Sequence, residues 1–187
     1  MVIRVNSLTE YIDKVLENTS DVYEMIYRGQ DSCKYDLISS IGRIKDYSVE
    51  VEKKLFVEFR KRYMQFTSSK INTDLELLIM AQHYGLPTRL LDWTFNPLVA
   101  LYFACEKEED VDGKVYSIPL NTSYNLEELG DLTLSIEKIL MTEKCKYIVP
   151  NYTEVRYSNQ KSLFLLCASP HRKFTFADTL KSADSSH

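Results

Sequence analysis

Two segments of this chain carry polar side chains suited to holding an anion. In the first, the planar and permanently charged guanidinium of Arg28 precedes Gly29 and Gln30. Glycine lets the backbone approach a ligand closely, and the guanidinium fork matches a phosphate or a carboxylate. We therefore expect Arg28 to contact such a group. The alternative is an ion pair with a core carboxylate such as Glu24 or Asp31.

The second segment is denser and runs from His83 to Thr94. Its polar and aromatic side chains fall within twelve residues, across two expected chain reversals: His83, Tyr84, Thr88, Arg89, Asp92, Trp93 and Thr94. We expect several of these side chains to converge on one site. In the alternative each has only a structural role, because turns favour such residues, for example an ion pair for Arg89 and a core position for Trp93.

Histidines and cysteines do not form the clusters that metal sites or hydrolytic sites need. The chain has three histidines and four widely spaced cysteines with no Cys-x-x-Cys pair, so neither a zinc site nor a disulfide framework is expected. No Ser-His-Asp or Cys-His order is visible, and the helix dipole favours a histidine in a last helical turn, where His83 is expected. We therefore expect no bound metal, no nucleophilic triad and reduced cysteines.

The second segment should be positioned by a helix, a short strand and another helix. A capping box over 73–76 opens a helix that should end at Tyr84, since Gly85 suits a left-handed cap. A short strand is expected over 89–93, followed directly by a helix over 97–106. The strand-to-helix turn then presents the second half of the segment.

Alternating apolar residues predict a strand over 22–28, which puts Arg28 at a strand end. The remaining expected elements are helices over 7–18, 48–66 and 136–141 and strands over 114–119, 147–149, 163–168 and 174–176.

Length and composition predict one compact domain. The chain has 187 residues, 44% of them hydrophobic, so a single domain over 1–187 with a frayed tail over 178–187 is expected. The net charge of -4 provides no general basic surface, which weighs against sequence-independent binding to duplex DNA. No apolar run approaches the ~20 residues that span a bilayer, and no signal-peptide core is visible, so we expect no membrane partner and a cytoplasmic location.

Two motifs of the chain resemble those of the FRG domain family. They are Tyr27-Arg28-Gly29-Gln30 and the block HYGLPTRLLDWT that begins at His83. The resemblance extends over about residues 20–177, although Ser162 stands where the family typically has glycine. It implies a bacterial or phage toxin or phage-defence context.

The order of these motifs is also similar to that of ADP-ribosyltransferases, which bind NAD between two small sheets. The similarity implies an α+β fold with two small mixed or antiparallel sheets flanked by helices, NAD as the substrate and no metal. It places Arg28 on the NAD phosphates or ribose and Thr94 on a strand of the site. Gln160 would stand at the position of the catalytic glutamate, where an amide stabilises positive charge poorly, and Glu154 is the nearest acid. The residues implied to hold NAD are Arg28, Gly29, Gln30, His83, Tyr84, Arg89, Asp92 and Trp93.

Three functions are consistent with these residues. The first is an ADP-ribosyltransferase or NAD glycohydrolase whose acceptor is a protein or a nucleic acid. The second is a non-catalytic module that binds a nucleotide or another phosphorylated ligand through Arg28 and Arg89. The third is a metal-dependent nuclease in which Asp92 and a second carboxylate, Glu76 or Glu154, hold magnesium.

Overall fold

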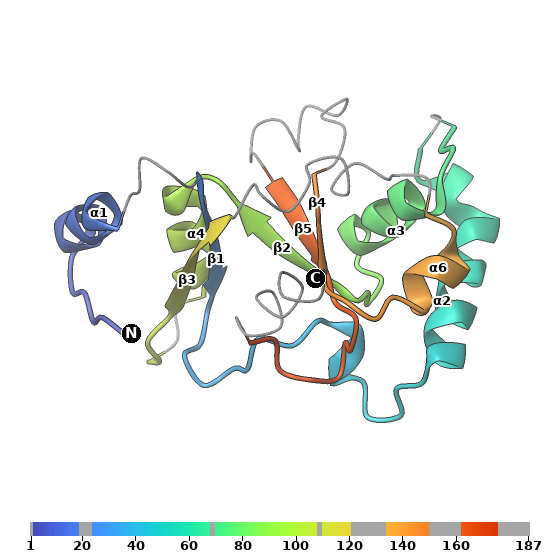
Figure 1. The fold of residues 1–187 in the computed structure, drawn as a ribbon, viewed down its shortest axis with the longest axis horizontal. Coiled ribbons are helices and arrows are strands. Elements are labelled where there is room, and N and C mark those ends of the chain that lie inside the picture. Colours follow the sequence, from blue (N-terminus) through green and yellow to red (C-terminus); the bar gives the residue numbers. More distant parts are fainter. Residues whose placement is uncertain are drawn as a thin grey trace, which may run out of the picture.

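The described strands form one antiparallel sheet. We analysed a computed structural model that describes residues 2–18, 24–67, 70–107, 110–120, 134–149 and 162–175. The strand order is β3-β1-β2-β5-β4 (Figure 1), with bounds Glu24–Gln30 (β1), Leu90–Thr94 (β2), Lys114–Leu120 (β3), Lys146–Ile148 (β4) and Ser162–Leu166 (β5). The α+β class is confirmed, whereas the expectation of two sheets is wrong.

The sheet is nevertheless joined weakly at its centre. β1 pairs with β3 along its whole length, from Glu24 opposite Leu120 to Gln30 opposite Lys114. The only register pair between β1 and β2 is Tyr27 opposite Thr94. The two strands diverge from that pair (Figure 1), and we call the region between their unpaired parts the split. A single bridging pair therefore explains why one sheet is found where two were expected.

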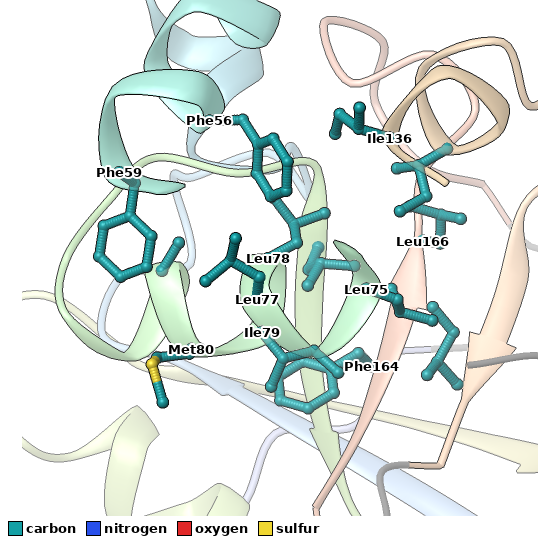
Figure 2. Packing of buried hydrophobic residues seen from close by; sticks show 14 of the residues in the cluster. Phe56, Phe59, Leu75, Leu77, Leu78, Ile79, Met80, Ile136, Phe164 and Leu166 are labelled. Carbon is teal, nitrogen blue, oxygen red and sulfur yellow. The ribbon is translucent and has the colours of Figure 1, made fainter. Parts of the chain in front are cut away.

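One face of the sheet is covered by helices. Three of them pack with β2, β4 and β5 into a hydrophobic core (Figure 2), and their bounds are Val49–Arg62 (α2), Asp74–His83 (α3) and Ile136–Leu140 (α6). α4, at Pro97–Ala104, packs on β1 so closely that a Cβ at Gly29 would lie 1.9 Å from the Ala100 carbonyl oxygen. Gly29 thus serves helix packing on this face.

The opposite face is covered by loops. Strand residues Ile26, Leu91 and Trp93 contribute to a second core, together with loop residues including Leu37 and Phe174. Because side chains alternate along a strand, Arg28 and Gln30 leave β1 on this loop face, and Asp92 leaves β2 on the helix face. The two faces therefore supply different partners to the split.

Local sequence signals placed most elements correctly. The Thr73 hydroxyl caps α3 by accepting from the Glu76 N–H at 3.2 Å, and Gly85 has φ +86°, as a left-handed cap requires. The expected helix over 7–18 is α1, Leu8–Glu17, capped by Ser7. No helix in the part of the chain that the structure describes is long and apolar enough to cross a membrane.

Three local expectations differ from the structure. The helix expected over 48–66 ends at Arg62 and continues as a 3-10 turn over Tyr63–Gln65. β1 extends to Gln30, so Arg28 lies within the strand instead of at its end, because pairing with β3 continues past it. Phe174 is a buried core residue outside any strand, and the tail over 178–187 lies outside the described residues.

Candidate functional site

Arg28 and Asp92 meet in the split. The Arg28 guanidinium Nη1 donates a hydrogen bond to the Asp92 main-chain oxygen at 2.6 Å, and it lies 3.6 Å from the carboxylate oxygen Oδ2. The β1–β2 pairing has ended at Tyr27 and Thr94, so the guanidinium occupies the place that a neighbouring strand would take. The expected alternative partners Glu24 and Asp31 are not the ones used.

The charge of Arg28 is only partly compensated. Its side chain is 17% exposed, and its Nε–H is buried with no hydrogen-bond partner among the described residues. Burial lowers the pKa of Arg28, Asp92 opposes this effect, and Arg43 adds to it. The guanidinium still stays protonated at neutral pH. The split thus holds a desolvated cation that an anion would stabilise.

The Asp92 carboxylate is fixed from the helix side. Its side chain is 61% exposed, and Oδ1 accepts a hydrogen bond from Gln82 Nε2 at 2.6 Å. The Thr88 hydroxyl donates in turn to Gln82 Oε1 and accepts from the Leu90 N–H at 3.1 Å. We call Arg28, Asp92, Gln82 and Thr88 the split network.

Two further polar atoms near the split are buried without a partner among the described residues. They are Gln30 Oε1 and Trp93 Nε1, on the same sheet face as the Arg28 side chain. Buried polar groups in proteins are normally hydrogen-bonded to the protein, to water or to a ligand. Together with Arg28 Nε, the loop face of the split therefore offers two donors and one acceptor.

Arg89, the other arginine expected to bind a ligand, is inside the protein. It is 1% exposed and forms two hydrogen bonds of 2.7 Å to the Glu52 carboxylate, which is 3% exposed. Its Nη1 donates to the Ile139 main-chain oxygen at 3.0 Å. The hydrogen bonds and charge of Glu52 outweigh the effect of burial and raise the pKa of Arg89. This is the ion pair considered from the sequence as the structural alternative.

His83, Tyr84 and Thr94, which were also expected at the site, have contacts with other residues. Tyr84 donates its hydroxyl proton to the Phe66 main-chain oxygen at 2.9 Å, and the His83 ring meets the Tyr84 ring edge-on at the exposed end of α3. Thr94 is buried and accepts from the Asn96 N–H at 3.0 Å, which shapes the turn into α4. The structure thus brings Arg28 and Asp92 together, whereas the Thr94 side chain stabilises the turn between β2 and α4.

Gln160 and Glu154, the residues expected at or near a catalytic position, lie outside the described residues. Within the described ranges, no group of three or more histidine, cysteine, aspartate or glutamate side chains is arranged to hold a metal ion.

Gln82 was missed from the sequence. It lies in the last turn of α3, where Leu75 and Leu78 occupy the same buried stripe seven and four residues earlier. A polar residue on a core stripe must find a hydrogen-bond partner, and that signal was available. Its partner, Asp92, follows ten residues later on another element.

The comparison with protein-family models finds a match that includes this site. Residues 23–113 match the model of the FRG domain, and this stretch contains the whole split network. No curated protein and no solved structure matches the chain. The match covers 91 of the 187 residues and contains both of the motifs that resemble the FRG domain family.

Proposed function

We propose that the split binds NAD or a related nucleotide and that the domain transfers ADP-ribose from it. The observation that carries this proposal is the buried Arg28 guanidinium. Its Nε–H has no partner among the described residues, and the one described carboxylate that pairs with it lies 3.6 Å away. A diphosphate placed against the Nε side of the guanidinium would complete its hydrogen bonding and its charge compensation.

The other atoms of the split suit the rest of such a ligand. Asp92 keeps Oδ2 beyond hydrogen-bond distance of Arg28, so this oxygen can accept a hydrogen bond from a ribose hydroxyl. Gln30 Oε1 and Trp93 Nε1 add an acceptor and a donor. This mixture fits a nucleotide, which carries phosphates, hydroxyl groups and amide groups, better than it fits a simple anion.

The reaction would break the glycosidic bond between nicotinamide and its ribose. An acceptor nucleophile attacks the anomeric carbon, loses its proton, and leaves joined to ADP-ribose, while nicotinamide departs with the bonding electrons. Positive charge develops on the ribose during this step. Gln160 stands at the sequence position of the catalytic glutamate, where an amide stabilises this charge poorly, so Glu154 is the proposed carboxylate. We propose that the sheet, divided at β1 and β2, is a variant of the ADP-ribosyltransferase fold, with a toxin or phage-defence role.

A non-catalytic nucleotide-binding module is the second candidate. One observation favours it: the only described carboxylate paired with Arg28 is Asp92, and Asp92 is already held by Gln82. In this case the ligand would bind in the same place and leave unchanged.

The deciding experiment follows nicotinamide by proton NMR in a mixture of NAD, purified protein and cell lysate. We expect release by the wild-type protein and none by Arg28→Ala. The control is Arg62→Ala, which removes an exposed arginine that pairs with Glu58 on the surface of α2. Release from all three proteins would contradict a role for Arg28. No release by the wild-type protein, together with saturable NAD binding, would establish the non-catalytic module.

A further inference from the structure

We infer that Gln82 is a positioning residue, which fixes the Asp92 carboxylate and thereby orients the Arg28 guanidinium toward the ligand. This inference rests on the proposed function of the split. Gln82 reaches Asp92 Oδ1 at 2.6 Å from α3, an element that does not otherwise belong to the β1–β2 junction. Its effect on Arg28 would pass through Asp92.

The hydrogen-bond directions in the network leave one consistent arrangement. The Leu90 N–H donates to the Thr88 hydroxyl oxygen, so the hydroxyl proton is available to Gln82 Oε1. The amide oxygen therefore faces Thr88, and the amide NH2 faces Asp92. Asp92 in turn accepts from Gln82 through Oδ1 while its main-chain oxygen accepts from Arg28. Thr88 thus fixes the rotamer of Gln82, and Gln82 fixes that of Asp92, whose carboxylate is the nearest negative charge to the Arg28 guanidinium.

The far end of this chain of hydrogen bonds is anchored in the core. Thr88 is fully buried, and its N–H donates to the Ser40 hydroxyl at 3.0 Å. The Thr88 main-chain oxygen accepts from the Ser40 hydroxyl at 3.1 Å and from the Ile41 N–H at 3.1 Å. A loop that covers one face of the sheet therefore holds the residue that orients a side chain in the split.

Asp92 needs this support because Arg28 alone holds its carboxylate loosely. The Arg28 contact to Oδ2 is 3.6 Å, too long for a hydrogen bond, and the Asp92 side chain is 61% exposed. Without Gln82 the Asp92 carboxylate can rotate into solvent. The negative charge nearest to the Arg28 guanidinium then no longer has a fixed position. The hydrogen bond from Arg28 to the Asp92 main-chain oxygen remains, so the loss is one of orientation and not of folding.

The test is Gln82→Glu, with ADP-ribose binding measured by calorimetry between about pH 5.5 and pH 8.5. The neighbouring Asp92 carboxylate raises the pKa of the introduced carboxyl group, because two carboxylates at this distance share one proton. In its protonated form the introduced side chain can donate to Asp92 as the amide does, and in its ionised form it cannot. We therefore expect near wild-type affinity at the acid end and a loss of about tenfold or more at the alkaline end. Gln65→Glu, which adds the same charge at an exposed site, should follow the wild-type curve.

A second measurement tests the effect of Gln82 on Arg28 without any ligand. The Arg28 Nε–H resonance, identified by its absence in Arg28→Lys, should be a single sharp signal in the wild-type protein and should broaden or shift in Gln82→Ala. In Gln82→Glu it should regain the wild-type position as pH falls. If ADP-ribose fails to bind the wild-type protein, the proposed function fails. The Arg28 signal still shows whether Gln82 orients Arg28 through Asp92. Wild-type affinity and an unchanged Arg28 signal in both Gln82 variants would overturn the inference.

Discussion

Arg28 and Arg89 lie in the same small domain, and their positive charges are compensated to different extents. Arg89 forms a bidentate pair with Glu52, with both hydrogen bonds at 2.7 Å, and both side chains are almost fully buried. Arg28 has one short hydrogen bond to a main-chain oxygen and a carboxylate at 3.6 Å. Accordingly, the pKa of Arg89 is raised by its partner, whereas that of Arg28 is lowered by burial.

The difference separates a structural charge from one that is available for binding. Arg89 connects α2, through Glu52, to the main-chain oxygens of Ile139 and Leu140 in α6. The Arg89 guanidinium thus donates its hydrogen bonds to groups inside the fold. Arg28 is less buried, with its side chain 17% exposed, and it keeps an N–H without a partner among the described residues. We propose that, in this domain, the incompletely paired arginine is the one that binds the ligand.

The largest predicted effect is the loss of Arg89. Arg89→Met leaves Glu52 buried without its cation, so we expect the free energy of unfolding to fall by about 3–5 kcal/mol. Urea denaturation followed by circular dichroism measures this. The double variant Arg89→Met/Glu52→Leu removes both charges and should recover part of the loss. A single variant within about 1 kcal/mol of the wild type would remove the distinction between the two arginines.

Gly29→Ala tests whether β1 is held by α4 packing. The added Cβ would lie 1.9 Å from the Ala100 carbonyl oxygen, so α4 must shift, at a cost of about 1–3 kcal/mol. Gly85→Ala is the matched control, because nothing lies within 4 Å of its Cβ and only its φ of +86° is unfavourable. That control should lose about 1 kcal/mol. Equal losses in thermal unfolding would argue against close packing at Gly29.

Arg28→Ala should change stability much less than Arg89→Met does. The only described hydrogen bond of its side chain is to a main-chain oxygen. We therefore expect the melting temperature to stay within a few degrees of the wild type, since about 1 kcal/mol shifts a domain of this size by roughly 2–8 °C. ADP-ribose binding by the same sample should be lost. A collapse of folding would show that Arg28 is as structural as Arg89.

The smallest predicted effect is a change in alkaline stability at Tyr47, whose hydroxyl donates to the Glu52 carboxylate at 3.1 Å. Burial and the charge of Glu52 raise the pKa of Tyr47 from 10.0 to about 12. The unfolded state therefore releases this proton first, and the contribution of Tyr47 to stability, complete below about pH 10, is lost as the pH rises toward 12. Tyr47→Phe should flatten the decline in unfolding free energy across this window. Parallel curves for the two proteins would contradict the shift.

Local structure could be predicted from the sequence, whereas the pairing of charges could not. The caps at Thr73 and Gly85 depend on residues within a few positions of each other, so their signals are complete in a short window. Glu52 and Arg89 are separated by 37 positions, and only the packing of α2 against the sheet brings them together. The sequence therefore showed that Arg28 and Arg89 were both candidates, and could not show which one the core would use.

The pairing of strands in the sheet also could not be predicted from short stretches of sequence. The alternation of apolar residues predicted β1, and the turn signals around it predicted β2, but their single shared pair, Tyr27 with Thr94, depends on how the strands twist and on what lies between them. Arg28 was expected to contact a ligand, and the structure places it with Asp92, whereas Gln82 was overlooked because its partner lies on another element. Long-range geometry, and not residue type, decided both outcomes.

Trp93 allows the split to be followed by intrinsic fluorescence. It is the only tryptophan in the chain, and it lies on β2 next to Asp92, with its indole N–H buried. The intrinsic fluorescence of the protein on selective tryptophan excitation thus originates at one position beside the split. A ligand that accepts a hydrogen bond from the indole would shift the emission, and unfolding would shift it further toward that of tryptophan in water. A titration of unlabelled protein can therefore monitor occupancy and folding with one native fluorophore.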